Sequence, residues 1–119
     1  MSRTRVTLTQ TIVLTALAYT LGAAPALADQ EAQIKRGQEI YTAQKCQICH
    51  AIAGKGNKMN PLDGVGKKLS LEDMKKWIIS PVEMAAQVKS TKKPPMPAKY
   101  GKLPAADVDA LVAYLQSLK

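Results

Sequence analysis

The pentapeptide Cys46-Gln47-Ile48-Cys49-His50 contains both cysteines and the only histidine of the 119-residue chain. So few thiol and imidazole groups exclude a structural zinc site with four Cys/His ligands, and also a multi-disulfide scaffold. A disulfide between Cys46 and Cys49 stays open as an interpretation. A dithiol redox motif has the same C-x-x-C spacing, but it normally lies at a strand-to-helix junction, and no alternating strand pattern is apparent in this sequence.

The spacing of the pentapeptide favours the covalent attachment of one haem. Two thiols three positions apart can add across the two vinyl groups of a haem, and the adjacent histidine then lies under the iron as an axial ligand. We therefore expect Cys46 and Cys49 to bind haem c, and His50 to bind its iron.

A methionine is the expected second axial ligand, because no second histidine remains. Met74 and Met84 fall in predicted helices, where a methionine more often fills the core. Met59 follows His50 closely in sequence, which makes the opposite haem face hard to reach. Met96 lies between prolines that stiffen the chain. We expect His50 and Met96 to bind the iron, a pair that favours its reduced state.

The first 28 residues have the order of a secretory signal peptide. Arg3 and Arg5 precede the uncharged stretch 6–28, which ends in Ala26-Leu27-Ala28. This order predicts cleavage at that point and a mature domain of residues 29–119, exported to the periplasm. The alternative is an uncleaved anchor, because the uncharged stretch is long enough to span a bilayer. We expect membrane contact only through such a segment or through a redox complex.

Helical periodicity predicts an all-α domain. Apolar residues recur at helical spacing in about four segments, separated by two long loops rich in glycine, proline and lysine. Loops of this length are uncommon unless they are functional. The predicted helices cover about 30–44, 70–80, 81–88 and 104–118, and the loops cover 53–69 and 89–103.

The composition is poor in aromatic residues. The chain has no phenylalanine, one tryptophan and four tyrosines. Large flat side chains usually supply much of the buried area of a small core. A covalently bound haem can take their place, so we expect the domain to fold poorly without it.

The sequence resembles the class I c-type cytochromes, of the small bacterial monohaem kind. The resemblance covers essentially all of residues 29–119 and implies the cytochrome c fold, with helices around one haem. It rests on matching positions along the whole domain: Gly37, Tyr41, Cys46 to His50, Asn60 to Gly66, Trp77-Ile78, Pro81, Met96-Pro97 and Ala110 to Leu115.

The resemblance also implies roles for residues outside the pentapeptide. The backbone carbonyl of Pro61 is expected to accept the ring N–H of His50, and Gly37 is expected where the terminal helices cross, beside Tyr114. Trp77 is expected to pack on the haem or to bond a propionate, with an ordinary core position as the alternative. The sequence departs from the family pattern at three places. Tyr41 replaces a frequent phenylalanine, Asn60 replaces a common glycine, and Lys67-Lys68 stand where an arginine near the propionates is frequent.

The charge of the chain points to acidic partners. The formal net charge is +8, and loss of Arg3 and Arg5 with the signal peptide leaves +6. Lysines are frequent in the segments expected to border the haem. One interpretation is a surface that is only solvated, and the other is a ring of positive charge that steers acidic redox partners. Nucleic acid is not an expected partner of an exported haem protein. These lysines are Lys45, Lys55, Lys58, Lys89, Lys92, Lys93, Lys99 and Lys102.

Together these features predict an electron carrier that moves single electrons on haem iron and transforms no small-molecule substrate. One alternative is a small cytochrome subunit of a larger periplasmic oxidoreductase. Another is a haem enzyme or sensor with an open iron position, which requires that Met96 does not bind.

Overall fold

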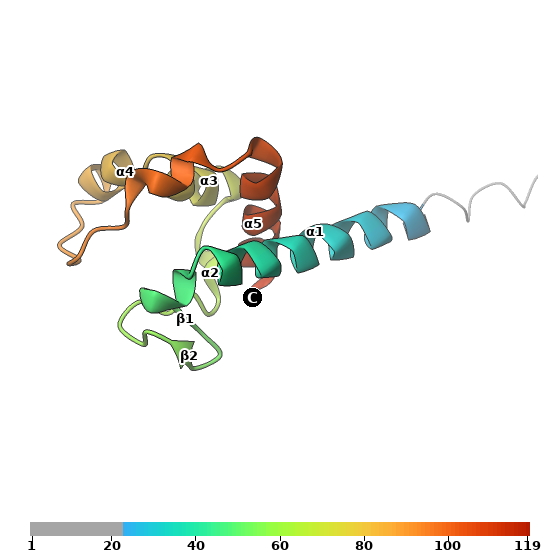
Figure 1. The fold of residues 1–119 in the computed structure, drawn as a ribbon, viewed down its shortest axis with the longest axis horizontal. Coiled ribbons are helices and arrows are strands. Elements are labelled where there is room, and N and C mark those ends of the chain that lie inside the picture. Colours follow the sequence, from blue (N-terminus) through green and yellow to red (C-terminus); the bar gives the residue numbers. More distant parts are fainter. Residues whose placement is uncertain (1–22) are drawn as a thin grey trace, which may run out of the picture.

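The computed structural model describes residues 23–119 (Figure 1). Residues 1–22, most of the predicted signal peptide, lie outside the described residues. The described elements are α1 (Ala23–Ala43), η1 (Cys46–Ile48), β1 (Ala51–Ile52), β2 (Lys55–Gly56), α2 (Val65–Lys68), α3 (Leu71–Ile79), α4 (Pro81–Gln87), η2 (Ala98–Lys102) and α5 (Ala105–Ser117), where η marks a 3-10 helix.

The four predicted helices are present as α1, α3, α4 and α5, with boundaries that differ by a few residues at most ends. The exception is the start of α1, which lies at Ala23 and therefore precedes the predicted cleavage point. Cleavage itself stays a prediction. Within residues 23–119, no helix combines the length and the apolar character needed to cross a membrane.

Short elements occupy part of the segment predicted as an irregular loop. Strand β1 pairs antiparallel with β2, and the single turn of α2 follows. The hairpin turns through Ala53 and Gly54, with φ of 50° and 74°, which is the pair of positive angles typical of a two-residue type I′ turn. Strands of two residues and a one-turn helix are too short to show periodicity, which explains why the pattern does not predict them.

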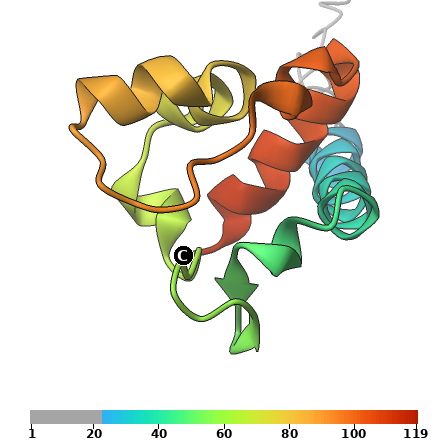
Figure 2. The ribbon, with the colours of Figure 1, turned by 60° about the vertical axis from the view of Figure 1, so that its left-hand side comes forward.

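Helices α1 and α5 cross at Gly37, as the resemblance implies. A Cβ atom at position 37 would clash with the carbonyl oxygen of Ala110 and with the Cβ of Tyr114. Figure 2 shows α5 running across α1, which is viewed nearly end-on. Beside the crossing, the rings of Tyr41 and Tyr114 meet edge to face with centroids 5.8 Å apart, and Ile40 is buried. This contact joins the two ends of the domain.

Helix α3 packs on the other side of α5. The Ser70 hydroxyl caps the helix by accepting the backbone N–H of Asp73 at 3.1 Å. Met74 and Ile78 are each 2 % exposed and join the hydrophobic cluster around Leu111 of α5. After α4 the chain leaves α3 and α5 and then returns to them at η2 (Figure 2). This returning segment, residues 88–97, carries the proline-rich motif.

Candidate functional site

The Cys46–His50 segment folds as one tight turn at the end of α1. Lys45 takes a left-handed conformation with φ of 56°, which ends the helix and redirects the chain. The N–H groups of Cys49 and His50 then donate to the carbonyl of Cys46 at 3.1 and 2.9 Å. Because residues at i, i+3 and i+4 of such a turn share a face, the two thiols and the imidazole all line the same cavity.

Both cysteines of this turn are free thiols, so a Cys46–Cys49 disulfide is absent from the structure. Burial raises the pKa of Cys46 to about 11. The two sulfurs are available for covalent attachment of a ligand in the cavity.

The His50 ring is held by a backbone carbonyl. Its Nδ1–H donates to the carbonyl oxygen of Asn60 at 3.1 Å, which leaves Nε2 free to bind a metal. The prediction that Pro61 supplies this carbonyl is wrong. Pro61 faces Ala51 in a parallel bridge, and the hydrogen bonds of that bridge come from Asn60 and Leu62. Because successive carbonyls in an extended chain point to opposite sides, that of Pro61 is turned away from the ring.

A cavity of about 340 Å³ lies between this turn, α3, α5 and the segment 88–97. Cys46, Cys49 and His50 line it together with Met96 and Trp77, so the structure brings together five of the six predicted site residues. The sixth, Pro61, does not line it. Most of the remaining wall is apolar and includes Leu62, Val65, Leu69, Ile78, Leu111 and Leu115.

Two of the methionines line this cavity. Met96 reaches it from the proline-rich segment and is half-buried. Met74 reaches it from α3, where it is 2 % exposed and packed in the hydrophobic cluster. Met59 is 76 % exposed and lies outside the cavity, and Met84 is buried in α4 away from it. Met96 and Met74 are therefore the two thioethers near enough to be considered as ligands.

The cytochrome c family model matches residues 34–119. The chain belongs to the cytochrome c family. Membership confirms the all-α cytochrome c fold, the covalently bound haem c with its iron, and the role of an electron carrier that the sequence predicted. No curated protein and no solved structure gives a significant match to the chain.

The residues of the cavity fit the haem of this family. Two thiols lie on one turn, next to an imidazole whose second nitrogen is already oriented by Asn60. The walls are mainly apolar, as a porphyrin requires, and they leave a void in the middle of a domain that has no phenylalanine. Cys46, Cys49 and His50 are the residues that would hold the group.

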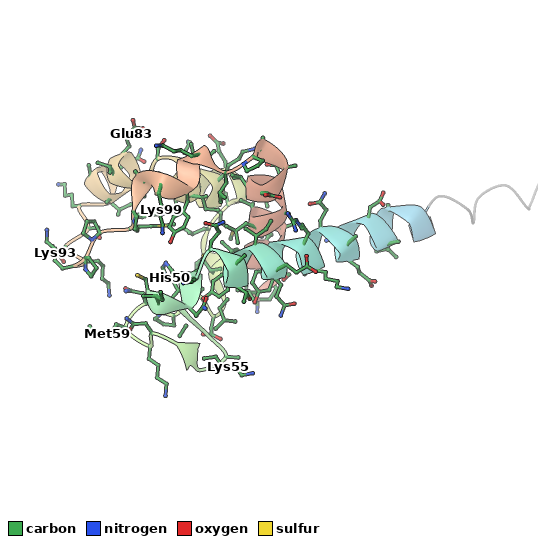
Figure 3. The ribbon with its side chains drawn as sticks, in the orientation of Figure 1. His50, Lys55, Met59, Glu83, Lys93 and Lys99 are labelled. Atoms are coloured by element: carbon green, nitrogen blue, oxygen red, sulfur yellow. The ribbon has the colours of Figure 1, made fainter. Side chains whose placement is uncertain are left out.

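The surface around the cavity is basic. All eight lysines named above are exposed, and none of them forms an ion pair with the described residues 23–119. Lys92 and Lys93 line the cavity itself. Figure 3 shows Lys93 and Lys99 on one side of His50 and Lys55 on the other. The cavity therefore lies between lysines of two distant segments.

Sequence reasoning missed two contributors to the site. Tyr100 lines the cavity, and burial raises its pKa. The scarcity of aromatic residues was a usable signal for it, because each of the few tyrosines is valuable core material. Asn60 contributes through its backbone carbonyl, so its side-chain type carries no signal for that role.

Proposed function

We propose that this chain is an exported, periplasmic electron carrier in which His50 and Met96 are the axial ligands of the haem iron. When bound, the haem supplies a one-electron Fe(II)/Fe(III) couple. The observation that carries the proposal is a single apolar cavity lined by two thiols, by an imidazole with its Nδ1–H engaged, and by a thioether from a distant segment.

Each residue of the cavity has a distinct task in this proposal. The Asn60 carbonyl fixes the tautomer of His50 and increases the basicity of its Nε2. Met96 would hold the iron through its thioether sulfur. The apolar walls exclude water, and Trp77 either packs on the haem or donates its indole N–H to a propionate. These roles are the ones that an electron carrier needs, and none of them requires a binding site for a substrate.

Met96 is favoured over Met74 as the iron ligand because the two residues lie in different kinds of backbone segment. Met74 is fixed in the middle of α3 and packs among buried residues. Met96 lies in a segment without regular structure, between prolines that restrict the backbone. A thioether on such a segment can reach the iron without disrupting a helix.

The absorption spectrum of the purified ferric protein tests this ligation. In proteins of this kind a weak far-red band marks the bond between methionine and iron. We expect Met96→Ala to abolish the band and to lower the reduction potential, because a thioether ligand favours reduced iron. The matched control, Met74→Leu, keeps the band. A band that survives Met96→Ala would overturn the assignment and make another methionine the ligand, whereas its loss in Met74→Leu would move the ligand to α3. Absence of the band from the parent protein would favour an enzyme or sensor with an open iron position.

We further propose that the lysines around the cavity steer acidic redox partners. The eight side chains are exposed and free of ion pairs with residues 23–119, so their charge is available to an approaching protein. An electrostatic attraction of this kind accelerates association and weakens as salt screens it.

Small redox reagents of opposite charge test the local field. We expect the rate of oxidation of the ferrous protein by ferricyanide to fall as ionic strength rises. The rate of reduction of the ferric protein by hexaammineruthenium(II) should rise. Lys99→Glu should slow the ferricyanide reaction several-fold more than Lys35→Glu, a control with the same charge change on α1. Rates that do not change with ionic strength for either reagent would contradict the steering role, and the lysines would then be only a solvated surface.

Export rests on residues 1–28 and is tested by the mass of the protein isolated from its native source. Cleavage after Ala28 predicts a mature chain that begins at Asp29 and carries one haem. The cleavage point lies within α1, whereas the crossing with α5 lies several residues later, at Gly37. A retained N-terminus would support the uncleaved anchor.

A second candidate function is a small cytochrome subunit of a larger oxidoreductase complex. Exposed apolar side chains on α3 and α4, away from the cavity, favour it: Leu71, Ile79 and Val82 are 56 %, 41 % and 67 % exposed. Sedimentation of the native protein distinguishes the two candidates. A free carrier sediments at about the mass of its own chain, and a subunit sediments with a larger partner.

A further inference from the structure

We propose that Asn57 is a positioning residue for the axial ligand His50, fastening the segment 57–60 to the haem-binding turn so that the Asn60 carbonyl meets the imidazole. The proposal rests on the proposed ligation by His50. It goes beyond that ligation because it concerns how a side chain outside the cavity fixes the orientation of the ring.

Asn57 bonds the haem-binding turn from one side. Its Nδ2 donates to the carbonyl of Ile48 at 3.3 Å. Its backbone N–H lies 3.0 Å from the carbonyl oxygen of Gln47 and 3.1 Å from that of His50. These acceptors belong to the turn that carries both thiols and the ligand, so Asn57 holds the backbone of the turn at several points.

Asn57 bonds its own loop from the other side. Its Oδ1 accepts the backbone N–H of Met59 at 3.0 Å. Its backbone carbonyl accepts the N–H of Asn60 at 3.4 Å, and the Asn60 carbonyl in turn accepts Nδ1–H of His50 at 3.1 Å. A closed circuit of hydrogen bonds therefore runs from the turn through Asn57 and Asn60 and back to the ligand on that turn.

The circuit needs a close approach that Gly56 permits. Its φ is 105°, and a Cβ at this position would clash with the carbonyl oxygen of His50. The end of β2 thus lies directly on the turn, and the next side chain, that of Asn57, has only to span a short gap. An amide suits this place because it offers one donor to the turn and one acceptor to the loop.

Solvent exchange of the His50 Nδ1 proton in the reduced, haem-loaded protein tests the proposal by nuclear magnetic resonance. The hydrogen bond to Asn60 protects this proton, so loosening the carbonyl accelerates its exchange. We expect Asn57→Ala to increase the rate about tenfold, the equivalent of one or two net hydrogen bonds. Backbone amides of α5 should exchange within about twofold of their original rates, because only the loop is released.

Two further variants make the result specific. Asn57→Asp keeps the acceptor for Met59 but loses the donor to Ile48, so an intermediate acceleration is expected even where Asn57→Ala binds too little haem to measure. Lys58→Ala, an exposed neighbour whose side chain makes no hydrogen bond or ion pair to residues 23–119, should leave the rate unchanged. An unchanged rate in Asn57→Ala and Asn57→Asp would overturn the proposal, and so would an equal acceleration throughout α5.

The same spectra separate this proposal from the proposed ligation. A ligand ring lies over the face of the haem, so its carbon-bound protons are strongly shifted by the ring current. If those shifts are present and the exchange rates do not respond to Asn57, the positioning role fails while the ligation stands. If the shifts are missing in the parent protein, the ligation itself fails.

Discussion

The crossing of α1 with α5 and the cavity between α3, α5 and the segment 88–97 are built on opposite principles. At the crossing, backbone meets backbone at Gly37, and no space remains for even one methyl group. At the cavity, apolar side chains surround about 340 Å³ that the chain does not fill. One half of the core is complete in amino acids, and the other half is completed by the haem.

This difference separates two sources of stability in a domain of modest size. The crossing is stabilised by close packing, so a larger side chain there should lower the stability of the domain. The side chains that line the cavity lack such packing on the side that faces its interior until the porphyrin is bound, because they would otherwise face a void or collapse together. Substitutions in the two regions should therefore respond differently to removal of the haem.

The largest expected effect comes from truncating one buried side chain in each region. In the haem-loaded protein, both Ile40→Ala and Met74→Ala should lower the free energy of unfolding by roughly 2–5 kcal/mol. In the haem-free chain, Met74→Ala should leave the helix content unchanged, because its packing partners are already disordered. Ile40→Ala should reduce whatever helix remains. Circular dichroism of the two variants, each with and without haem, measures the helix content. Equal losses of helix in the two haem-free variants would contradict the difference between the regions.

The next effect concerns added volume at the crossing. Gly37→Ala should lower the free energy of unfolding by roughly 3 kcal/mol, because the new methyl group pushes against the Ala110 carbonyl and the helices must separate. Gly54→Ala is the matched control. It adds the same methyl group where nothing lies within 4 Å, and its cost is only the roughly 1 kcal/mol of a left-handed alanine. Denaturant titration compares them, and equal losses would show that the crossing is not tightly packed.

The smallest effect is a dependence of stability on alkaline pH. Burial raises the pKa of Tyr41 from 10 in the unfolded chain to about 12 in the folded one. The neutral phenol is favoured in the folded state, so its contribution is complete below pH 10 and is lost as the pH rises toward 12. At pH 11 the loss is on the order of 1 kcal/mol. We expect Tyr41→Phe to make unfolding by denaturant less dependent on pH over this interval, and an identical dependence in both proteins would contradict this.

Much of the fold and site could be predicted because the deciding residues carry their signal in their side chains. The pentapeptide at Cys46 fixes the chemistry, and the apolar stripe of α5 and the cap at Ser70 mark the helices. The hairpin and α2 could not be predicted, because they are shorter than any hydrophobic period. The Asn60 carbonyl could not be predicted either, because the direction of a backbone group depends on how the chain pairs with Ala51.

The helix content and melting of the haem-free chain test the central claim most directly. The variant Cys46→Ala/Cys49→Ala prevents both haem attachment and a disulfide while leaving the remaining residues in place. We predict far less helix than in the haem-loaded protein and a broad, non-cooperative thermal transition by circular dichroism. Native-like helix content with a sharp cooperative melt would contradict the account, because the chain would then complete its core without the haem.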